Sequence, residues 1–478
     1  MNILKTLAVL STAFLTAAVS AKVIPGSLIT DNMVLPQNTD ARLYGKADPG
    51  SKIDVTPSWN GKTYSAITDK TGNWSLAVET PAGGYTPYTI TISDGQPLTI
   101  SNVLIGEVWL ASGQSNMEMP LKGFPGCVLN DGYDEIASAR HQADNIRIVT
   151  IPAARSYTPV ETVDAVWTVP SADTAPFYSA TAWYFARQLN DALDVPIGIV
   201  SDAYGGTRVE SWTPREILET YPDVSLKPED IEAMVHYERP LLMYNAMFVP
   251  VKNYSYNGII WYQGCSNVGA DENYADRLVN MVNHWRESIG LGDIPFYQVE
   301  IAPYDYSGNP KQDGKAPLLR KAQWDAAGRI PNGGIISTND LVQPYERFNI
   351  HPGDKKSVGH RLANLALNKT YGKRQFLCEH PRYKSHVVKD GAIWVAVDSP
   401  SDGICRNYDI TGFEIAGPDK VFHPADSVDF KWQTNEFVVS SKNVPDPVAV
   451  RYGWRDFLPG NVYAANRLPL VPFRTDDW

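Results

Sequence analysis

Between residues 106 and 374, short apolar runs alternate with stretches of helical periodicity, and this alternation constrains the fold more than any other feature. Parallel strands buried on both faces read as continuous apolar runs, and each pair needs a crossover connection, usually a helix. The apolar runs are EVWLA (107–111), PIGIVSDA (196–203), NGIIWYQ (257–263), PFYQVEI (295–301) and GIIST (334–338). Helical stretches occupy 182–194, 272–289, 316–328 and 355–367. The pattern predicts an α/β fold: a doubly wound, mostly parallel sheet with helices on both faces.

The sequence on either side of this region favours β structure. Residues 22–105 contain short alternating runs separated by turn signals such as Pro81-Ala82-Gly83-Gly84, and β patterns return from residue 375. Both flanks are typical of β-sandwich-like regions. We therefore expect an N-terminal β domain over 22–105, a catalytic domain over 106–374 and a C-terminal β region over 375–478.

The first 21 residues are typical of a secretory signal peptide. Lys5 supplies a positive charge, residues 7–18 are apolar but too short to span a bilayer, and Val19-Ser20-Ala21 resembles a cleavage site. We expect export to the periplasm or out of the cell, a mature chain that starts at Lys22, and no membrane association after cleavage.

The charge and the cysteines limit the partners and the cross-links. The formal net charge is −11 and no strongly basic segment offsets it, which argues against a nucleic-acid partner. Export permits disulfides, and the four cysteines allow three full pairings. Proximity in the chain favours Cys378 with Cys405, which leaves Cys127 and Cys265 to pair or to stay free.

Polar residues follow several of the predicted strands, where open α/β sheets bind their ligands. They comprise a serine, two glycines, a carboxamide, a carboxylate and a histidine. In chain order these are Ser115, Gly205, Gly206, Gln263, Asp340 and His351. A nucleophile, a base and hydrogen-bond donors for an oxyanion are the requirements of acyl transfer.

Each of these residues also has a purely structural interpretation. Ser115 could cap a helix, and Gly205-Gly206 could form a tight turn. Gln263 could bind loop backbone, and His351 before Pro352 could cap the following helix. Their combination at successive strand ends is what favours catalysis.

Four ordered stretches resemble the SGNH-hydrolase superfamily and, within it, the sialate O-acetylesterase family of carbohydrate esterases. They are GEVWLASGQSNMEMPL (106–121), AYGGTRVESWTP (203–214), IIWYQGCSNV (259–268) and HPGDKKSVGHRLA (351–363). LITDNMVLPQ (28–37), GKADPGSKIDV (45–55) and residues 450–478 also resemble the family, so the resemblance covers nearly the whole mature chain. It implies an SGNH-type catalytic domain and hydrolysis of acetyl esters on a sugar or glycan substrate.

The resemblance also implies residue roles. Ser115 matches the nucleophile and His351 the general base, while the oxyanion hole would combine the Ser115 N–H, an N–H of Gly205 or Gly206, and the Gln263 carboxamide. Arg208 and Trp212 follow the glycines and could contact the sugar, or could be a surface ion pair and a core aromatic. We expect no metal or cofactor, because neither an H-E-x-x-H motif nor paired C-x-x-C motifs occur.

The sequence departs from the family pattern at two positions. Cys265 stands where the family has a glutamate after Gln-Gly, and Phe348 stands three residues before His351, where many SGNH enzymes have an aspartate. Asp340, at a strand end, is our first candidate for the triad acid. Asp354 and Glu346 are further candidates, and a Ser–His dyad is also open.

Three other functions remain open at this level. A hemicellulose acetylesterase, active on xylan or xyloglucan, would share the catalytic residues. A non-catalytic carbohydrate-binding protein would not depend on Ser115, and a thiol enzyme would depend on Cys265. The sequence does not predict the oligomeric state.

Overall fold

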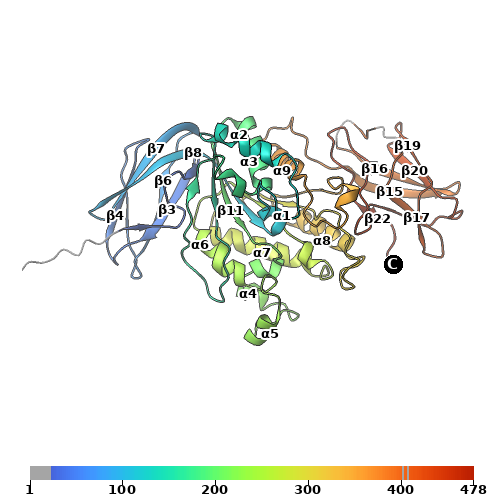
Figure 1. The fold of residues 1–478 in the computed structure, drawn as a ribbon, viewed down its shortest axis with the longest axis horizontal. Coiled ribbons are helices and arrows are strands. Elements are labelled where there is room, and N and C mark those ends of the chain that lie inside the picture. The colour runs from blue at the N-terminus through green and yellow to red at the C-terminus, as the bar shows by residue number, and fades with distance from the viewer. Residues whose placement is uncertain (1–22, 401–402, 406–408) are drawn as a thin grey trace, which may run out of the picture.

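The computed structural model describes residues 23–400, 403–405 and 409–478, so the predicted signal peptide lies outside the described residues. Along the long axis of the molecule, an N-terminal β part is followed by a central α/β part and a C-terminal β part (Figure 1). No helix in these described ranges is long and apolar enough to cross a membrane.

The central sheet is mostly parallel, as the alternating pattern predicts. Its strand order is β10-β9-β11-β8-β12-β13-β14, and all neighbours pair in parallel except the short edge strand β10. The strands are β8 (Pro97–Gly113), β9 (Ile146–Thr150), β10 (Trp167–Thr168), β11 (Ile197–Ala203), β12 (Gly258–Tyr262), β13 (Phe296–Val299) and β14 (Gly333–Ile336). The carboxyl ends of β8, β11 and β12 therefore meet at one edge of the sheet.

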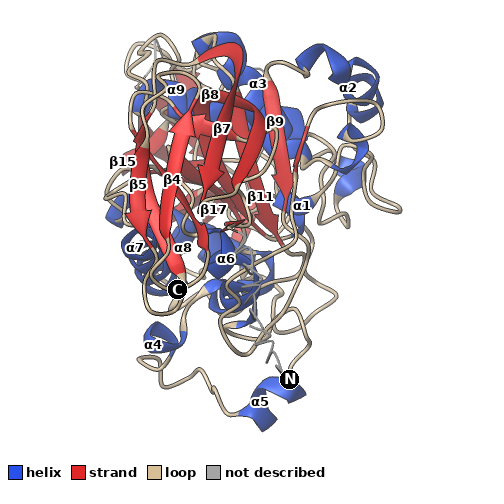
Figure 2. Ribbon diagram, turned by 90° about the vertical axis from the view of Figure 1, so that its left-hand side faces the viewer, coloured by secondary structure: helices blue, strands red, loops and turns tan. Residues whose placement is uncertain are grey.

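Helices cover both faces of this sheet (Figures 1 and 2). Alternate residues of β8 point to opposite faces, so that Val108 and Leu110 join one buried cluster while Trp109 and Ala111 join another. The first cluster contains side chains of α7 (Tyr274–Ile289) and α8 (Ala316–Arg329). The second contains those of α3 (Ala180–Leu193) and α9 (Lys355–Lys369). This arrangement confirms the predicted helices on both faces.

The strand β8 connects the N-terminal part to the central sheet without a break. Its first half pairs with β7 (Gly84–Ser93), and its second half pairs with β11 and β12. The boundary expected after residue 105 therefore falls inside one continuous strand.

Each flanking part is built from β-strands around an apolar core. In the N-terminal part, β1 (Ile24–Pro25), β3 (Asp40–Lys46) and β6 (Asn73–Glu79) form one sheet, while β2 (Val34–Pro36), β4 (Lys52–Pro57), β5 (Tyr64–Ile67) and β7 extend β8. The C-terminal part has two four-stranded sheets, whose buried side chains share one core. These are β15 (Arg382–Lys389), β16 (Ala392–Asp398), β20 (Glu436–Ser440) and β19 (Ser427–Lys431), then β18 (Phe422–Pro424), β17 (Phe413–Ala416), β21 (Ala449–Tyr452) and β22 (Phe473–Arg474). The sandwich interpretation of the flanks stays a prediction.

The short helices lie in connections of the central part. They are α1 (Ser115–Glu118), α2 (Gly132–Ser138), α4 (Arg215–Leu218), α5 (Pro228–Ala233) and α6 (Val249–Val251). Of these, α1 directly follows β8 at the carboxyl edge of the sheet.

All four cysteines are free, so the expected Cys378–Cys405 disulfide does not form, and Cys127 and Cys265 follow the alternative in which they stay unpaired. Cys378 is buried in the core beside α3 and α9, whereas the Cys405 thiol donates to the Ala464 carbonyl in the C-terminal part. Near the end of β8, the Cys265 sulfur accepts from the Asn116 side chain at 4.0 Å, and Cys127 contacts the His351 loop as described below. Proximity in the chain did not predict pairing, because Cys378 lies in the core of the central part and Cys405 lies in the C-terminal part.

Candidate active site

The end of β8 is fixed to the end of β12. Gly113 has φ +138°, and a Cβ there would overlap the Tyr262 carbonyl, so this position requires glycine. The Gln114 N–H donates to the Tyr262 carbonyl (2.9 Å), and the Gln114 side-chain oxygen accepts from the Gly264 N–H (2.7 Å). Ser115 follows as the first residue of α1 and is thereby held at the carboxyl edge of the sheet.

Ser115 and His351 meet at this edge, as the sequence predicts. The Ser115 Oγ lies 2.8 Å from the His351 Nε2, although 236 positions separate the two residues. The Asn116 side chain donates to the Ile350 carbonyl (3.0 Å) and so ties the nucleophile helix to the histidine loop. The arrangement fits a serine nucleophile with a histidine base.

The second ring nitrogen of His351 faces a thiol. The Cys127 Sγ lies 3.7 Å from the His351 Nδ1 and 3.3 Å from the Asn349 Oδ1. The same Asn349 oxygen accepts the His351 backbone N–H (3.0 Å), and the Phe124 ring contacts the imidazole at a centroid distance of 5.1 Å. None of Cys127, Asn349 and Phe124 was predicted as a partner of the histidine. One signal was available, because an asparagine two residues before the histidine favours an Asx turn.

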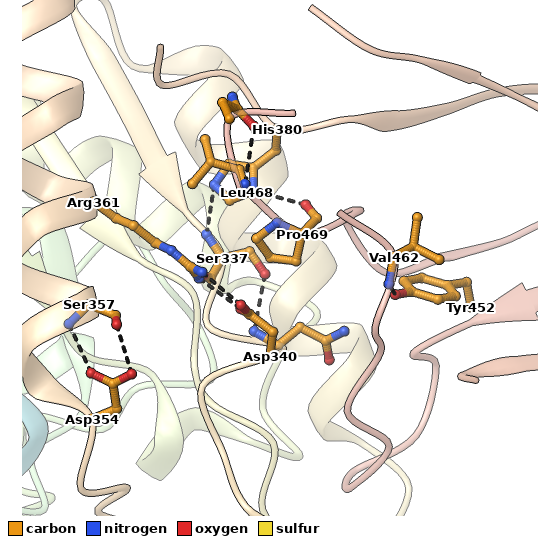
Figure 3. Close-up of polar contacts among 12 residues, drawn as sticks. Ser337, Asp340, Asp354, Ser357, Arg361, His380, Tyr452, Val462, Leu468 and Pro469 are labelled. Carbon is orange, nitrogen blue, oxygen red and sulfur yellow. Dashed lines mark hydrogen bonds and ion pairs between the residues drawn. The ribbon is translucent and has the colours of Figure 1, made fainter. Parts of the chain in front are cut away.

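Asp340 is not the partner of His351, which makes our first candidate for the triad acid wrong. Its two carboxylate oxygens pair with both Nη atoms of Arg361 on α9, each at 2.7 Å (Figure 3). The Asp340 side chain is only 5% exposed and that of Arg361 11%. The buried guanidinium therefore uses the carboxylate that a catalytic histidine would need.

The other two candidate acids have structural roles. Asp354 caps α9 by accepting from the Ser357 N–H (2.9 Å) and hydroxyl (2.7 Å) (Figure 3). Glu346 accepts from the N–H groups of Gln343 and Gly353, both at 2.8 Å, and so shapes the loop that carries His351. Within the described residues, none of the three carboxylates bonds to His351.

Two backbone N–H groups lie at the nucleophile. The Ser115 N–H opens α1 and has no acceptor inside the helix. A Cβ at Gly205 would lie 3.4 Å from the Ser115 Cβ, which places this glycine against the nucleophile. The Glu118 carboxyl, one turn after Ser115, lies beside Gly205. By contrast, a Cβ at Gly206 would strike the Tyr237 ring at 2.6 Å. Of the two glycines, Gly205 is the one that lies against the Ser115 side chain.

Gln263 does not contribute to the oxyanion hole. Its Nε2 donates to the Thr207 carbonyl (3.0 Å) and to the Asn267 Oδ1 (2.8 Å), which uses both amide hydrogens. Its Oε1 accepts from the Tyr274 hydroxyl (3.0 Å), and the residue is fully buried. The carboxamide instead joins the glycine loop to the turn after β12.

Arg208 and Trp212 take the structural alternatives that the sequence left open. Arg208 forms a half-buried ion pair with Glu238 (2.9 Å). Trp212 is fully buried against Trp261 and Trp285, and its Nε1 donates to the Thr207 hydroxyl (2.9 Å). Trp212 is therefore a core aromatic that cannot contact a sugar.

Burial controls the electrostatics around Ser115. Burial, followed by the positive charge of Lys355, lowers the pKa of His351 to about 4. Burial also raises the pKa of the Glu118 carboxyl above its usual value. The Cys265 thiol has a pKa raised to about 11 by burial, so it stays protonated at neutral pH. This protonation argues against a thiol enzyme based on Cys265.

The low pKa of His351 predicts an activity that persists into acid. Only the neutral imidazole accepts the Ser115 proton, so kcat/KM is lost as pH falls through the pKa of about 4. For an aryl acetate we expect a plateau above about pH 5 and a tenfold loss per pH unit below about pH 4. Returning acid-treated samples to pH 7 checks for unfolding. An acid limb centred near pH 6.5 would contradict this prediction.

Comparisons with known proteins identify the family of this chain. Residues 105–368 match the family described as carbohydrate esterase, sialic acid-specific acetylesterase. The sialate O-acetylesterase of Homo sapiens is 28% identical over 391 residues, which cover 74% of this chain and 72% of the human protein. The Mus musculus enzyme is 26% identical, covering 74% and 75%. A crystal structure of a carbohydrate acetylesterase from Xanthomonas citri matches with a TM-score of 0.83 and 30% identity, covering 96% of this chain and 100% of the other. The chain therefore belongs to the sialic acid-specific acetylesterase family of carbohydrate esterases, which act on acetylated sugars.

Proposed function

We propose that this enzyme removes O-acetyl groups from sialic acids, with Ser115 as nucleophile and His351 as general base. The observation that carries the proposal is the 2.8 Å contact between the Ser115 Oγ and the His351 Nε2 at the carboxyl edge of the sheet. The sialic acid-specific description of the matching family supports the substrate.

The proposed reaction has two halves. His351 takes the Ser115 proton while the Oγ bonds to the acetyl carbonyl carbon, and the N–H groups of Ser115 and Gly205 stabilise the resulting oxyanion. The intermediate collapses, the bond from carbon to the sugar oxygen breaks, and protonated His351 gives its proton to that oxygen. Water then attacks the acetyl-enzyme in the same way, releasing acetate and restoring Ser115. For Gly205 to donate, the oxyanion must reach its N–H past the neighbouring Glu118 carboxyl.

A second candidate substrate is an acetylated neutral sugar of the hemicellulose type. The Glu118 carboxyl lies close to Gly205 beside Ser115, and Glu238 already neutralises Arg208. A carboxylate near the nucleophile disfavours an anionic sugar through like-charge repulsion.

Acetate release from matched substrates tests the proposal. We expect kcat/KM for an O-acetylated sialic acid to exceed that for an acetylated xylo-oligosaccharide, with both activities abolished in Ser115→Ala. The reverse order would move the assignment to the neutral sugar. Sugar binding without any acetate release would contradict an esterase altogether.

Arg208→Gln tests how a sialic acid carboxylate is recognised. If the guanidinium leaves Glu238 to bind that carboxylate, the variant raises KM for the O-acetylated sialic acid by roughly tenfold, because a charge-assisted hydrogen bond contributes about 1.5–3 kcal/mol. The KM for an aryl acetate should stay within about twofold, since that substrate carries no such charge. Arg215→Gln, which removes an exposed pair with Glu219, is the matched control. Equal effects on both substrates would exclude this role for Arg208.

Export is part of the proposal. It rests on the signal-peptide pattern of residues 1–21. N-terminal sequencing of the mature protein from a periplasmic or culture fraction should begin at Lys22, whereas an intact Met1 in that fraction would contradict cleavage at this site.

A further inference from the structure

The histidine of a serine hydrolase needs a group at its Nδ1 that holds the ring in the productive tautomer. Because the His351 Nε2 accepts from Ser115, its Nδ1 must carry the ring proton. Within the described chain, the hydrogen-bond partner of this nitrogen is the Cys127 Sγ, at 3.7 Å. The thiol has an acceptor of its own in the Asn349 Oδ1, at 3.3 Å.

We propose that Cys127 is the positioning residue of this active site, occupying the place that an acid holds in a triad. The Nδ1–H of His351 donates to the Cys127 sulfur, the Cys127 S–H donates to the Asn349 Oδ1, and His351 Nε2 is left free to accept the Ser115 proton. Asn349 holds both the thiol and the histidine, because its Oδ1 accepts from the Cys127 S–H and also from the His351 backbone N–H at 3.0 Å. The inference rests on the proposed roles of Ser115 and His351.

A thiol at the His351 Nδ1 orients the imidazole without placing a carboxylate beside it. The groups facing His351 are Ser115 on α1, Cys127 and Phe124 on the loop before α2, and Lys355 on α9, whose ammonium is buried. None of them is a carboxylate. A carboxylate at this place would stabilise the imidazolium and raise its pKa, typically by about 1–3 units. With a thiol in this place, the pKa of His351 stays at the low value that burial and the positive charge of Lys355 give it.

The position of Cys127 also makes activity sensitive to thiol reagents. Cys127 is half-buried, and so is Cys405, whereas Cys265 and Cys378 are buried. Methyl methanethiosulfonate transfers its methylthio group to a thiolate and releases methanesulfinate, forming a mixed disulfide that dithiothreitol reverses. A methylthio group on Cys127 would displace the His351 ring, whereas the same group on Cys405 would lie on the C-terminal part.

Three substitutions at Cys127 test the proposal with an aryl acetate as substrate. Cys127→Ala should lower kcat by about 10- to 100-fold with KM within about twofold, because orientation of the base matters in the transition state. Cys127→Ser, which restores a donor and an acceptor, should recover most of that loss. Cys127→Asp should move the acid limb of kcat/KM upward by about 1–3 pH units. Cys405→Ala is the control. It should match the wild type in kcat and pH profile, and the thiol reagent should still inactivate it because Cys127 is intact.

The outcomes separate the failure of this inference from the failure of the proposed function. If Cys127→Ala keeps kcat within about twofold and Cys127→Asp leaves the acid limb in place, Cys127 does not position His351. If Cys127→Ala does not fold, the other two variants test the inference. An unshifted acid limb in Cys127→Asp would then contradict it. Inactivation by the reagent should also disappear in Cys127→Ser, and persistent inactivation there would overturn the inference. Retained activity in Ser115→Ala would instead overturn the proposed nucleophile.

Discussion

Ser115→Ala is expected to lower kcat for an aryl acetate by on the order of 10⁴- to 10⁶-fold, with little change in the melting temperature. The hydroxyl supplies the electron pair that forms the acyl-enzyme, and no other hydroxyl lies at His351 within the described residues. Such a loss corresponds to about 5–8 kcal/mol of transition-state stabilisation. Direct attack by water, aided by the Ser115 and Gly205 N–H groups, sets the residual rate.

The histidine provides the matched comparison. His351→Ala should cost about as much as Ser115→Ala, and the double variant should be no worse than either, because the two residues act as one unit. Ser138→Ala removes a partly buried hydroxyl at the end of α2 and should leave kcat unchanged. Acetate release within about tenfold of the wild type in Ser115→Ala, or fully additive losses in the double variant, would refute the nucleophile–base pair.

The sequence was sufficient to predict the sheet and the meeting of Ser115 with His351, for a physical reason. Apolar runs buried on both faces identify parallel strands, and parallel strands bring their carboxyl ends to one edge. That argument places Ser115 after β8 and allows His351 to reach it. It depends only on backbone topology, which the apolar pattern records.

The errors concern where side chains point and what they pair with. Asp340 follows β14 as expected, but Arg361, one element later on α9, takes both of its oxygens. Gln263 follows β12, but its amide turns into the protein toward Thr207 and Asn267. These choices depend on how side chains meet in three dimensions, at sequence separations from 4 residues (Asn267) to 56 residues (Thr207), which periodicity does not report. Cys127 was missed for the same reason, since its role depends on a contact with a residue 224 positions away.

Asp340→Asn is expected to destabilise the protein strongly while leaving the chemistry intact. The substitution keeps the shape of the side chain but leaves the Arg361 guanidinium buried without a countercharge. Removing one partner of a buried ion pair typically costs about 3–5 kcal/mol, whereas the pair itself contributes little relative to well-packed apolar residues. We therefore expect a lower urea midpoint and a lower melting temperature, with kcat per folded molecule within about threefold of the wild type at 15–20 °C, roughly where domains are most stable.

A paired substitution separates the lost countercharge from lost packing. Arg361→Met combined with Asp340→Leu removes both charges, and it should recover much of the stability that Asp340→Asn loses. Lys321→Ala, which breaks an exposed pair with Asp325, should change stability by less than about 1 kcal/mol. A triad acid would behave in the opposite way: Asp340→Asn would retain stability and lose kcat by orders of magnitude. Both oxygens of the Asp340 carboxylate bind Arg361, so the carboxylate could contact the histidine only if it left a buried cation without a countercharge. For this reason we expect the loss of Asp340 to lower stability and not turnover.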